Sequence, residues 1–178
     1  MLESDLDAWL PECAVRTHHA RDARADPDAL WDAARGVQVC DARRIGRVVR
    51  WRIPGTPATA TFHETLGRYP FTVLEQGARH SISGLCGRIW TLARDYPKLS
   101  GPDEFRAWDE RGTVRVLIAN WVEPLDDGGS RLVSEARVQP VDRRASLRLR
   151  ALWRIISPFE RFVGAEALAL AARRAEDG

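Results

Sequence analysis

The sequence predicts an α+β protein in which a curved antiparallel sheet wraps around a long, kinked C-terminal helix, with two short helices after the first strand. Residues 113–122 and 131–141 alternate between apolar and polar side chains, and the Asp-Asp-Gly-Gly sequence at 126–129 between them is typical of a hairpin turn. From Asp142 onward, apolar residues recur at three- and four-residue steps, as they do on one face of a helix. A helix with a wide apolar face, placed directly after a hairpin, needs a sheet to cover that face.

The first part of the chain predicts a strand and two helices. Residues 13–21 have the composition of a strand with one polar face. Asp26 is suited to cap a helix that starts at Pro27, and Gly36 is suited to end it. A second helix is predicted over residues 41–51, before a stretch rich in Pro and Gly.

The middle of the chain predicts a short helix, two strands and a helical turn, over residues 58–68, 71–76, 79–91 and 103–109. Gly84 and Gly87 lie inside the second of these strands, where a bulge or bend is expected.

The C-terminal helix is predicted to bury one apolar face and to bend. The face consists of Leu149, Leu152, Trp153, Ile156, Phe159, Val163, Ala167 and Leu170. Pro158 removes a backbone donor and clashes with the carbonyl of Arg154, so a kink is expected there.

Alternation divides the last two strands into an inner and an outer set. The inner set, expected to face the helix, is Val114, Val116, Ile118, Asn120, Val122, Leu132, Ser134, Ala136 and Val138. The outer set, expected to face solvent, includes Arg115, Trp121, Arg131, Glu135, Arg137 and Gln139. Glu135 with a neighbouring arginine is then interpreted as a surface pair, with a catalytic carboxylate as the alternative.

Length and composition indicate one globular domain over residues 1–178, with residues 1–12 and 174–178 as candidates for flexible ends. Apolar residues make up 44% of the chain and the net charge is +2, which does not favour a nucleic-acid partner. Three cysteines without a CxxC pair favour a reducing, cytoplasmic environment. The sequence shows neither a signal peptide nor a membrane span.

No recognised catalytic or metal-binding motif is present, so no cofactor or metal is expected and no catalytic residue is assigned. His18 and His19 are adjacent in a strand and point to opposite faces, and Cys86 is interpreted as a small core residue. The arginines at 143, 150, 154 and 161 form a stripe on the last helix. This stripe is interpreted as a solvated face, with a weak contact to an anionic membrane or an acidic partner as the alternative.

A cavity between sheet and helix is the candidate site. Asn120 is the one amide among the inner positions, and a buried amide needs partners from protein, water or ligand. The other candidate lining residues are Trp90, Trp153, His80, Val116 and Ile118.

The chain resembles the START-like (SRPBCC) superfamily, whose members share the helix-grip fold, and within it a small bacterial branch of uncharacterised proteins. The resemblance depends on residues 84–90, 105–112, 134–138 and 152–158. At 134–137 the branch pattern reads Thr-Glu-Thr-Arg, and here Ser134 and Ala136 replace both threonines. Because members include lipid carriers, hormone receptors and polyketide cyclases, the resemblance implies a fold and a hydrophobic ligand, but no particular reaction.

Three functions follow as hypotheses. The first is binding or carriage of a hydrophobic small molecule, such as a lipid, polyketide or aromatic compound, without catalysis. The second is an enzyme of the polyketide cyclase or aromatase type, in which a polar group in the pocket moves protons. The third is a ligand-free protein-interaction module, such as a homodimer that uses an exposed Trp121.

Overall fold

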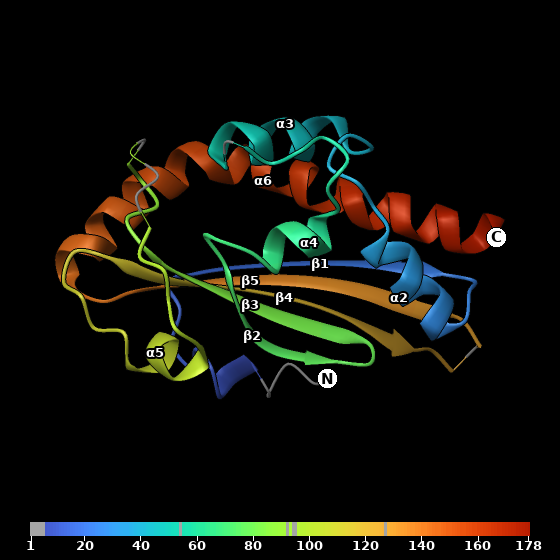
Figure 1. Cartoon of the computed structure of the whole chain (residues 1–178), viewed down its shortest axis with the longest axis horizontal. Helices are drawn as coiled ribbons and strands as arrows, with labels where there is room; N and C mark the ends of the chain where they lie inside the picture. The colour runs from blue at the N-terminus through green and yellow to red at the C-terminus, as the bar shows by residue number, and fades with distance from the viewer. Residues whose placement is uncertain (1–5, 54, 92, 94–95, 127) are drawn as a thin grey trace.

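A five-stranded antiparallel sheet with one long helix along its inner face forms the centre of the molecule (Figure 1). The computed structural model describes residues 6–53, 55–91, 93, 96–126 and 128–178, with only the backbone for residue 52 and residues 158–164. The strands are β1 (Val15–Ala23), β2 (Thr72–Gly77), β3 (His80–Gly87), β4 (Val114–Pro124) and β5 (Ser130–Pro140). The helices are α2 (Pro27–Arg35), α3 (Arg43–Arg52), α4 (Phe62–Leu66), α5 (Pro102–Ala107) and α6 (Arg143–Asp177). The predicted curved antiparallel sheet around a C-terminal helix is confirmed, and this is the helix-grip arrangement.

The strands follow the order β1-β5-β4-β3-β2, and every neighbouring pair is antiparallel. The predicted hairpin is the longest pairing, running from Val114 opposite Pro140 to Pro124 opposite Ser130. A register shift lies in β2 between Val73 and Glu75, so the irregularity falls on the strand that pairs with β3. Gly87 ends β3 with φ +135°, a backbone conformation that favours glycine.

Local sequence signals define the ends of several helices. The Asp26 carboxylate accepts the N–H of Asp28 at 2.8 Å, and α2 begins at Pro27 and ends at Gly36, as predicted. Thr61 and Glu64 form a reciprocal capping box on α4. Asp142 caps α6 by accepting the N–H of Ala145 at 2.7 Å.

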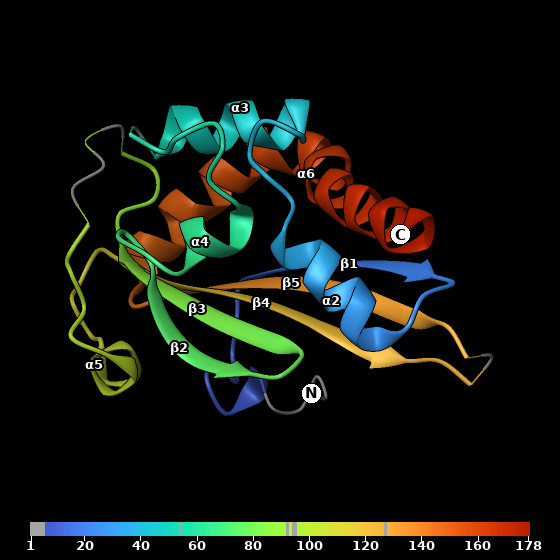
Figure 2. The same ribbon diagram turned by 45° about the vertical axis from the view of Figure 1, so that its right-hand side comes forward.

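The helices divide unequally between the two faces of the sheet. Helix α6 covers the inner face, α2 and α4 lie beside it, and α3 packs against α6 above the same face of the sheet (Figures 1 and 2). Helix α5 and the N-terminal segment lie on the opposite face. The expectation that this outer face is open to solvent is therefore wrong.

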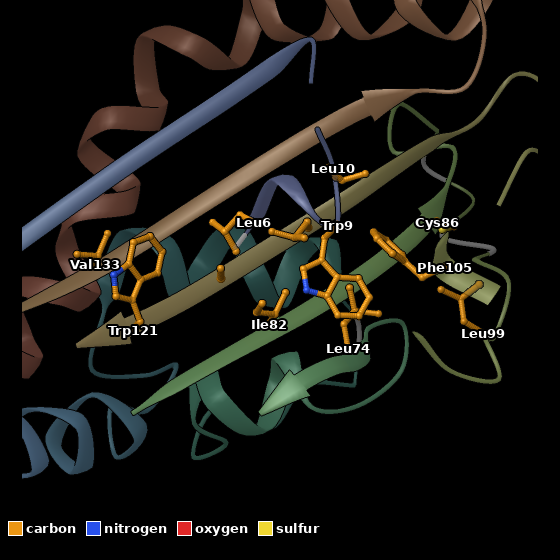
Figure 3. Close-up of a cluster of buried hydrophobic side chains, with 12 residues drawn as sticks. Leu6, Trp9, Leu10, Leu74, Ile82, Cys86, Leu99, Phe105, Trp121 and Val133 are labelled. Atoms are coloured by element: carbon orange, nitrogen blue, oxygen red, sulfur yellow. The ribbon is translucent and has the colours of Figure 1, made fainter. Parts of the chain in front are cut away.

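The outer face carries a buried cluster of apolar side chains beneath the N-terminal segment (Figure 3). We call the following residues the outer cluster: Leu6, Trp9, Leu10, Leu74, Ile82, Cys86, Leu99, Phe105, Leu117, Ala119, Trp121 and Val133. Leu6 and Leu10 are fully buried. Part of the segment expected to be flexible, residues 1–12, thus belongs to the core. At the other expected flexible end, Glu176 accepts the N–H of Arg24 at 2.8 Å.

Helix α6 is continuous in secondary structure and bends in its middle third, which contains Pro158 (Figures 1 and 2). The predicted face residues Leu149 and Trp153 pack toward the sheet. Ile156 is 39% exposed, so its predicted place on the buried face is wrong. The predicted contributions of the Pro158, Phe159 and Val163 side chains lie outside the described residues. No described helix combines the length and hydrophobicity that a membrane crossing requires.

Candidate ligand cavity

A cavity of about 230 Å³ lies between the inner face of the sheet and helices α2, α3, α4 and α6. Its walls are mainly apolar. They include Trp31, Ala34, Val37, Ile45, Val49, Ile53, Phe62, Leu66, Phe71, Ile118, Leu132, Ala167, Leu168 and Ala171.

The size of the side chains on α6 decides where the space stays open. In the first third of α6, Leu149 and Trp153 pack against the sheet in a cluster with Trp90 and Val116. Further along, α6 presents Ala167 and Ala171 to the cavity. Because alanine extends only one carbon from the backbone, it cannot bridge the distance between a helix and a sheet. The space is therefore filled near the start of α6 and open near its end.

Three polar side chains lie side by side on the sheet surface of the cavity. Ser81 pairs with Asn120 across β3 and β4, and Asn120 pairs with Ser134 across β4 and β5. We call these three residues the polar row. Within the described part of the chain, their side chains form no hydrogen bond to protein, and Asn120 and Ser134 are only partly buried, so their donors and acceptors are open to the cavity. The polar row can therefore bond to a ligand that enters an otherwise apolar space.

His63, from α4, is the ionisable residue best placed to act in the cavity. Its ring meets the Trp31 ring edge to face, with 6.2 Å between the ring centroids. Burial lowers the pKa of His63, and the charge of Arg35 lowers it further, while Glu64 opposes the shift. The imidazole is therefore neutral at pH 7 and can either accept or donate a hydrogen bond.

The structure separates the residues predicted for the site into three groups. Asn120 and Ile118 line the cavity. Val116, Trp90 and Trp153 belong to the filled region beside it, where the Trp90 indole N–H is buried without a described partner. His80 lies on the outer face, where its Nε2 is 3.1 Å from Glu75 Oε1, so it does not reach the cavity.

Sequence reasoning missed three polar residues of the cavity. Ser134 belonged to the predicted inner set, so its position on the inner face followed from strand alternation. The position of Ser81 beside Asn120 could not be predicted, because it depends on the register between β3 and β4. His63 had no detectable signal, because α4 reaches the cavity only through the packing of α2 and α3. Among the described residues, no three side chains of the His, Cys, Asp or Glu type gather as a metal site.

Glu135 lies on the outer face, but it is not the surface residue that was predicted. It is fully buried, and its carboxylate accepts hydrogen bonds from Arg137 at 2.6 Å and Arg16 at 2.9 Å and lies 3.1 Å from His18 Nδ1. Arg137 is also buried and bonds to Asp7 and to the Leu10 carbonyl. This network fixes the N-terminal segment to the sheet.

Two further expectations for single residues have opposite outcomes. Trp121, expected to be exposed, is 2% exposed within the outer cluster and donates its indole N–H to Glu123 at 2.6 Å. Cys86 is a buried core residue, as predicted, and burial raises the pKa of its thiol to about 12. A thiol with that pKa is not a nucleophile at neutral pH.

No protein-family model matches the sequence, and no curated protein matches it.

Comparison with solved structures gives similar chains at low sequence identity. A hypothetical protein of Helicobacter pylori is 12% identical with a TM-score of 0.39, covering 95% of this chain and 93% of that one. A Rhizobium loti protein is 17% identical with a TM-score of 0.36, covering 90% and 96%. A Streptomyces aromatase/cyclase is 13% identical with a TM-score of 0.30, covering 90% and 94%. These TM-scores are low, so the similarity carries no conclusion about function.

Proposed function

We propose that the protein binds a small apolar molecule carrying one polar group in the cavity between the sheet and α6. One observation supports this most: the polar row of Ser81, Asn120 and Ser134 has no described hydrogen-bond partner and borders an apolar space. Carriage of such a molecule, rather than its conversion, agrees with the absence of a catalytic constellation among the described residues and with the START-like resemblance.

The volume limits the ligand. Most pockets for drug-sized ligands measure roughly 300–1,000 Å³, and this cavity measures about 230 Å³. A cavity of about 150 Å³ accepts benzene. The present cavity therefore suits a bicyclic aromatic compound or an aliphatic chain of similar bulk.

The polar row should select ligands that carry a hydroxyl or carbonyl group. A hydrogen bond to a neutral partner contributes about 0.5–1.5 kcal/mol, and leaving a buried polar group unpaired costs about 1–3 kcal/mol. A ligand that supplies an oxygen there should bind about tenfold more tightly than the same hydrocarbon without it.

The test compares naphthalene with 2-naphthol by calorimetry on the wild type and on Asn120→Ala. We expect the wild type to prefer 2-naphthol and Asn120→Ala to lose most of that preference while still binding naphthalene. Ser134→Ile should weaken both ligands, because it adds apolar bulk to the cavity wall. Thr17→Ile is the matched control, since β1 places this residue on the same sheet face outside the cavity lining. If neither compound binds the wild type, or if Ser134→Ile binds as well as Thr17→Ile, the proposal is wrong.

His63 supports a second candidate, an enzyme of the cyclase type in which a neutral imidazole takes a proton from the bound molecule. A base held in its neutral form beside an apolar space has the protonation state that such a step needs. His63→Gln should then abolish turnover of an aromatic or polyketide substrate while retaining its binding. In wild type the rate should fall at pH values below the lowered pKa of His63, where the imidazole is protonated. A substrate turned over equally by His63→Gln would rule out this role.

A further inference from the structure

Helix α3 has two distinct long faces. Ile45, Val49 and Ile53, at steps of four, line the cavity. The opposite half of the helix surface carries six residues at exposed or largely exposed positions, which we call the outer α3 face: Arg43, Arg44, Arg47, Val48, Arg50 and Trp51. Trp51 is 58% exposed and Val48 is 48% exposed.

The arginines of the outer α3 face have no carboxylate partner among the described side chains. Within the described chain, the guanidinium groups of Arg43, Arg44, Arg47 and Arg50 form no ion pair, whereas Arg79 and Arg131 each have one. Arg47, Arg50 and Trp51, with residues 55–57, line an open hollow of about 590 Å³. Two guanidinium groups at one hollow are suited to bind a phosphate oxygen pair.

We propose that the outer α3 face docks on an anionic lipid bilayer, with Arg47 and Arg50 on lipid phosphates and Trp51 in the headgroup layer. A helix that combines arginines with an exposed tryptophan and an aliphatic residue has the composition of an interfacial membrane helix. Tryptophan favours this layer because its ring is apolar and its N–H is polar. Four arginines on one half of a helix complement a negative surface, and an acidic protein partner would not need the apolar pair.

Docking would place the cavity next to the lipid, because the same helix contributes Ile45 and Val49 to the cavity wall, and its C-cap residue Ile53 lies there too. An apolar ligand could then pass between bilayer and cavity with little exposure to water. This exchange step rests on the proposed ligand binding, whereas docking itself does not. This proposal places a membrane contact on α3, whereas the sequence suggested one on the arginine stripe of α6.

Vesicle co-sedimentation of the full chain tests the docking. The vesicles are phosphatidylcholine alone, or phosphatidylcholine with phosphatidylglycerol as about a third of the lipid. We expect binding only to the anionic vesicles and its loss at high salt. Each arginine near an anionic surface contributes about fivefold in partitioning, so Arg47→Gln/Arg50→Gln should bind roughly 25-fold more weakly. Trp51→Ala should lose about tenfold.

The matched control is Arg21→Gln/Arg68→Gln, which changes the net charge equally at two exposed arginines outside the outer α3 face. It should bind anionic vesicles nearly as well as wild type. Docking through α3 is excluded if the wild type does not bind anionic vesicles, or if both double variants lose binding equally. It is also excluded if Trp51→Ala binds the vesicles like wild type and loses only self-association, measured by light scattering. Naphthol binding by the same variants shows separately whether the cavity is functional.

Discussion

The carboxylate of Glu135 is the clearest case of a side chain whose surroundings reverse the expectation from its sequence. Strand alternation assigned Glu135 and Arg137 correctly to the face opposite α6. It could not show that residues more than a hundred positions earlier cover that face. Burying a charge costs several kcal/mol unless partners compensate, and here Arg16, Arg137 and His18 supply them.

Removing this carboxylate should destabilise the fold strongly. We expect Glu135→Ala to lower the free energy of unfolding by about 3–5 kcal/mol, because the buried Arg137 loses its buried carboxylate partner and keeps only the more exposed Asp7. Glu135→Leu/Arg137→Met should cost less than the single change, since it removes both buried charges and leaves only the more exposed Asp7 and Arg16 without these partners. Urea unfolding measures both, and Asp22→Asn, in an exposed pair with Arg131, is the control that should change little. A double variant less stable than Glu135→Ala would contradict this interpretation.

The same residue should make stability depend on pH. Burial alone would raise the pKa of Glu135, but hydrogen bonds from Arg16, Arg137 and His18 outweigh it and lower the pKa below the ordinary value of 4.5. The unfolded chain therefore takes up a proton first as the pH falls. The stabilisation is complete above the unfolded pKa and is lost as the pH falls through the folded pKa. The difference in unfolding free energy between wild type and Glu135→Gln should shrink below about pH 4.5, and a constant difference would refute the assignment.

At the scale of elements, β3 and α5 approach each other closely at Gly84. A Cβ atom there would lie 2.7 Å from Phe105 and 2.8 Å from Leu74, both members of the outer cluster. The sequence signalled an unusual position at this glycine, but its reason is close packing of side chains and not a bulge at Gly84 itself.

Gly84→Ala should therefore destabilise the protein by about 1–3 kcal/mol, since Phe105 and Leu74 must move in a packed core. Gly36→Ala is the matched control, because its Cβ would meet only backbone oxygens at 3.5 and 3.6 Å, an ordinary contact distance. The measurement is the melting temperature of each variant, which should be lower for Gly84→Ala than for Gly36→Ala. Equal melting temperatures would show that α5 yields to the added methyl group.

At the scale of the whole molecule, the sequence predicted the sheet and the helix on its inner face. It did not predict the layer of α5 and the N-terminal segment on the outer face. The hairpin, the strand order of β4 and β5 and the apolar face of α6 follow from short-range patterns, and so does the place of Asn120 and Ile118 on the inner face. In the described part of the N-terminal segment, the buried apolar residues are Leu6, Trp9 and Leu10, and so short a pattern does not predict which surface the segment covers. His63 and Ser81 were missed for a related reason, because the cavity arises where several elements meet.

Deleting residues 1–11 should therefore affect the entire protein. Three buried apolar side chains contribute about 1.5–3 kcal/mol each, which is comparable with the total stability of a typical domain, about 5–15 kcal/mol. We expect the truncated chain to unfold at much lower urea concentration than wild type. Leu6→Ala/Leu10→Ala provides the same test if the truncated chain does not fold, and Ala8→Ser, at an exposed position, is the control. An unchanged urea midpoint would show that the outer cluster is stable without this cover.

The carboxylate of Glu166 joins the start of α3 to the last helix. Ala42 provides no side-chain cap for α3, and Glu166 instead accepts the N–H groups of Arg44 and Ile45 at 2.9 and 3.0 Å. These bonds join positions 122 and 121 residues apart. The first turn of α3 therefore has these backbone donors satisfied only when α6 is packed beside it. Because Ile45 and Val49 belong to the cavity wall, a displacement of α6 at Glu166 would free these two N–H groups and loosen that wall.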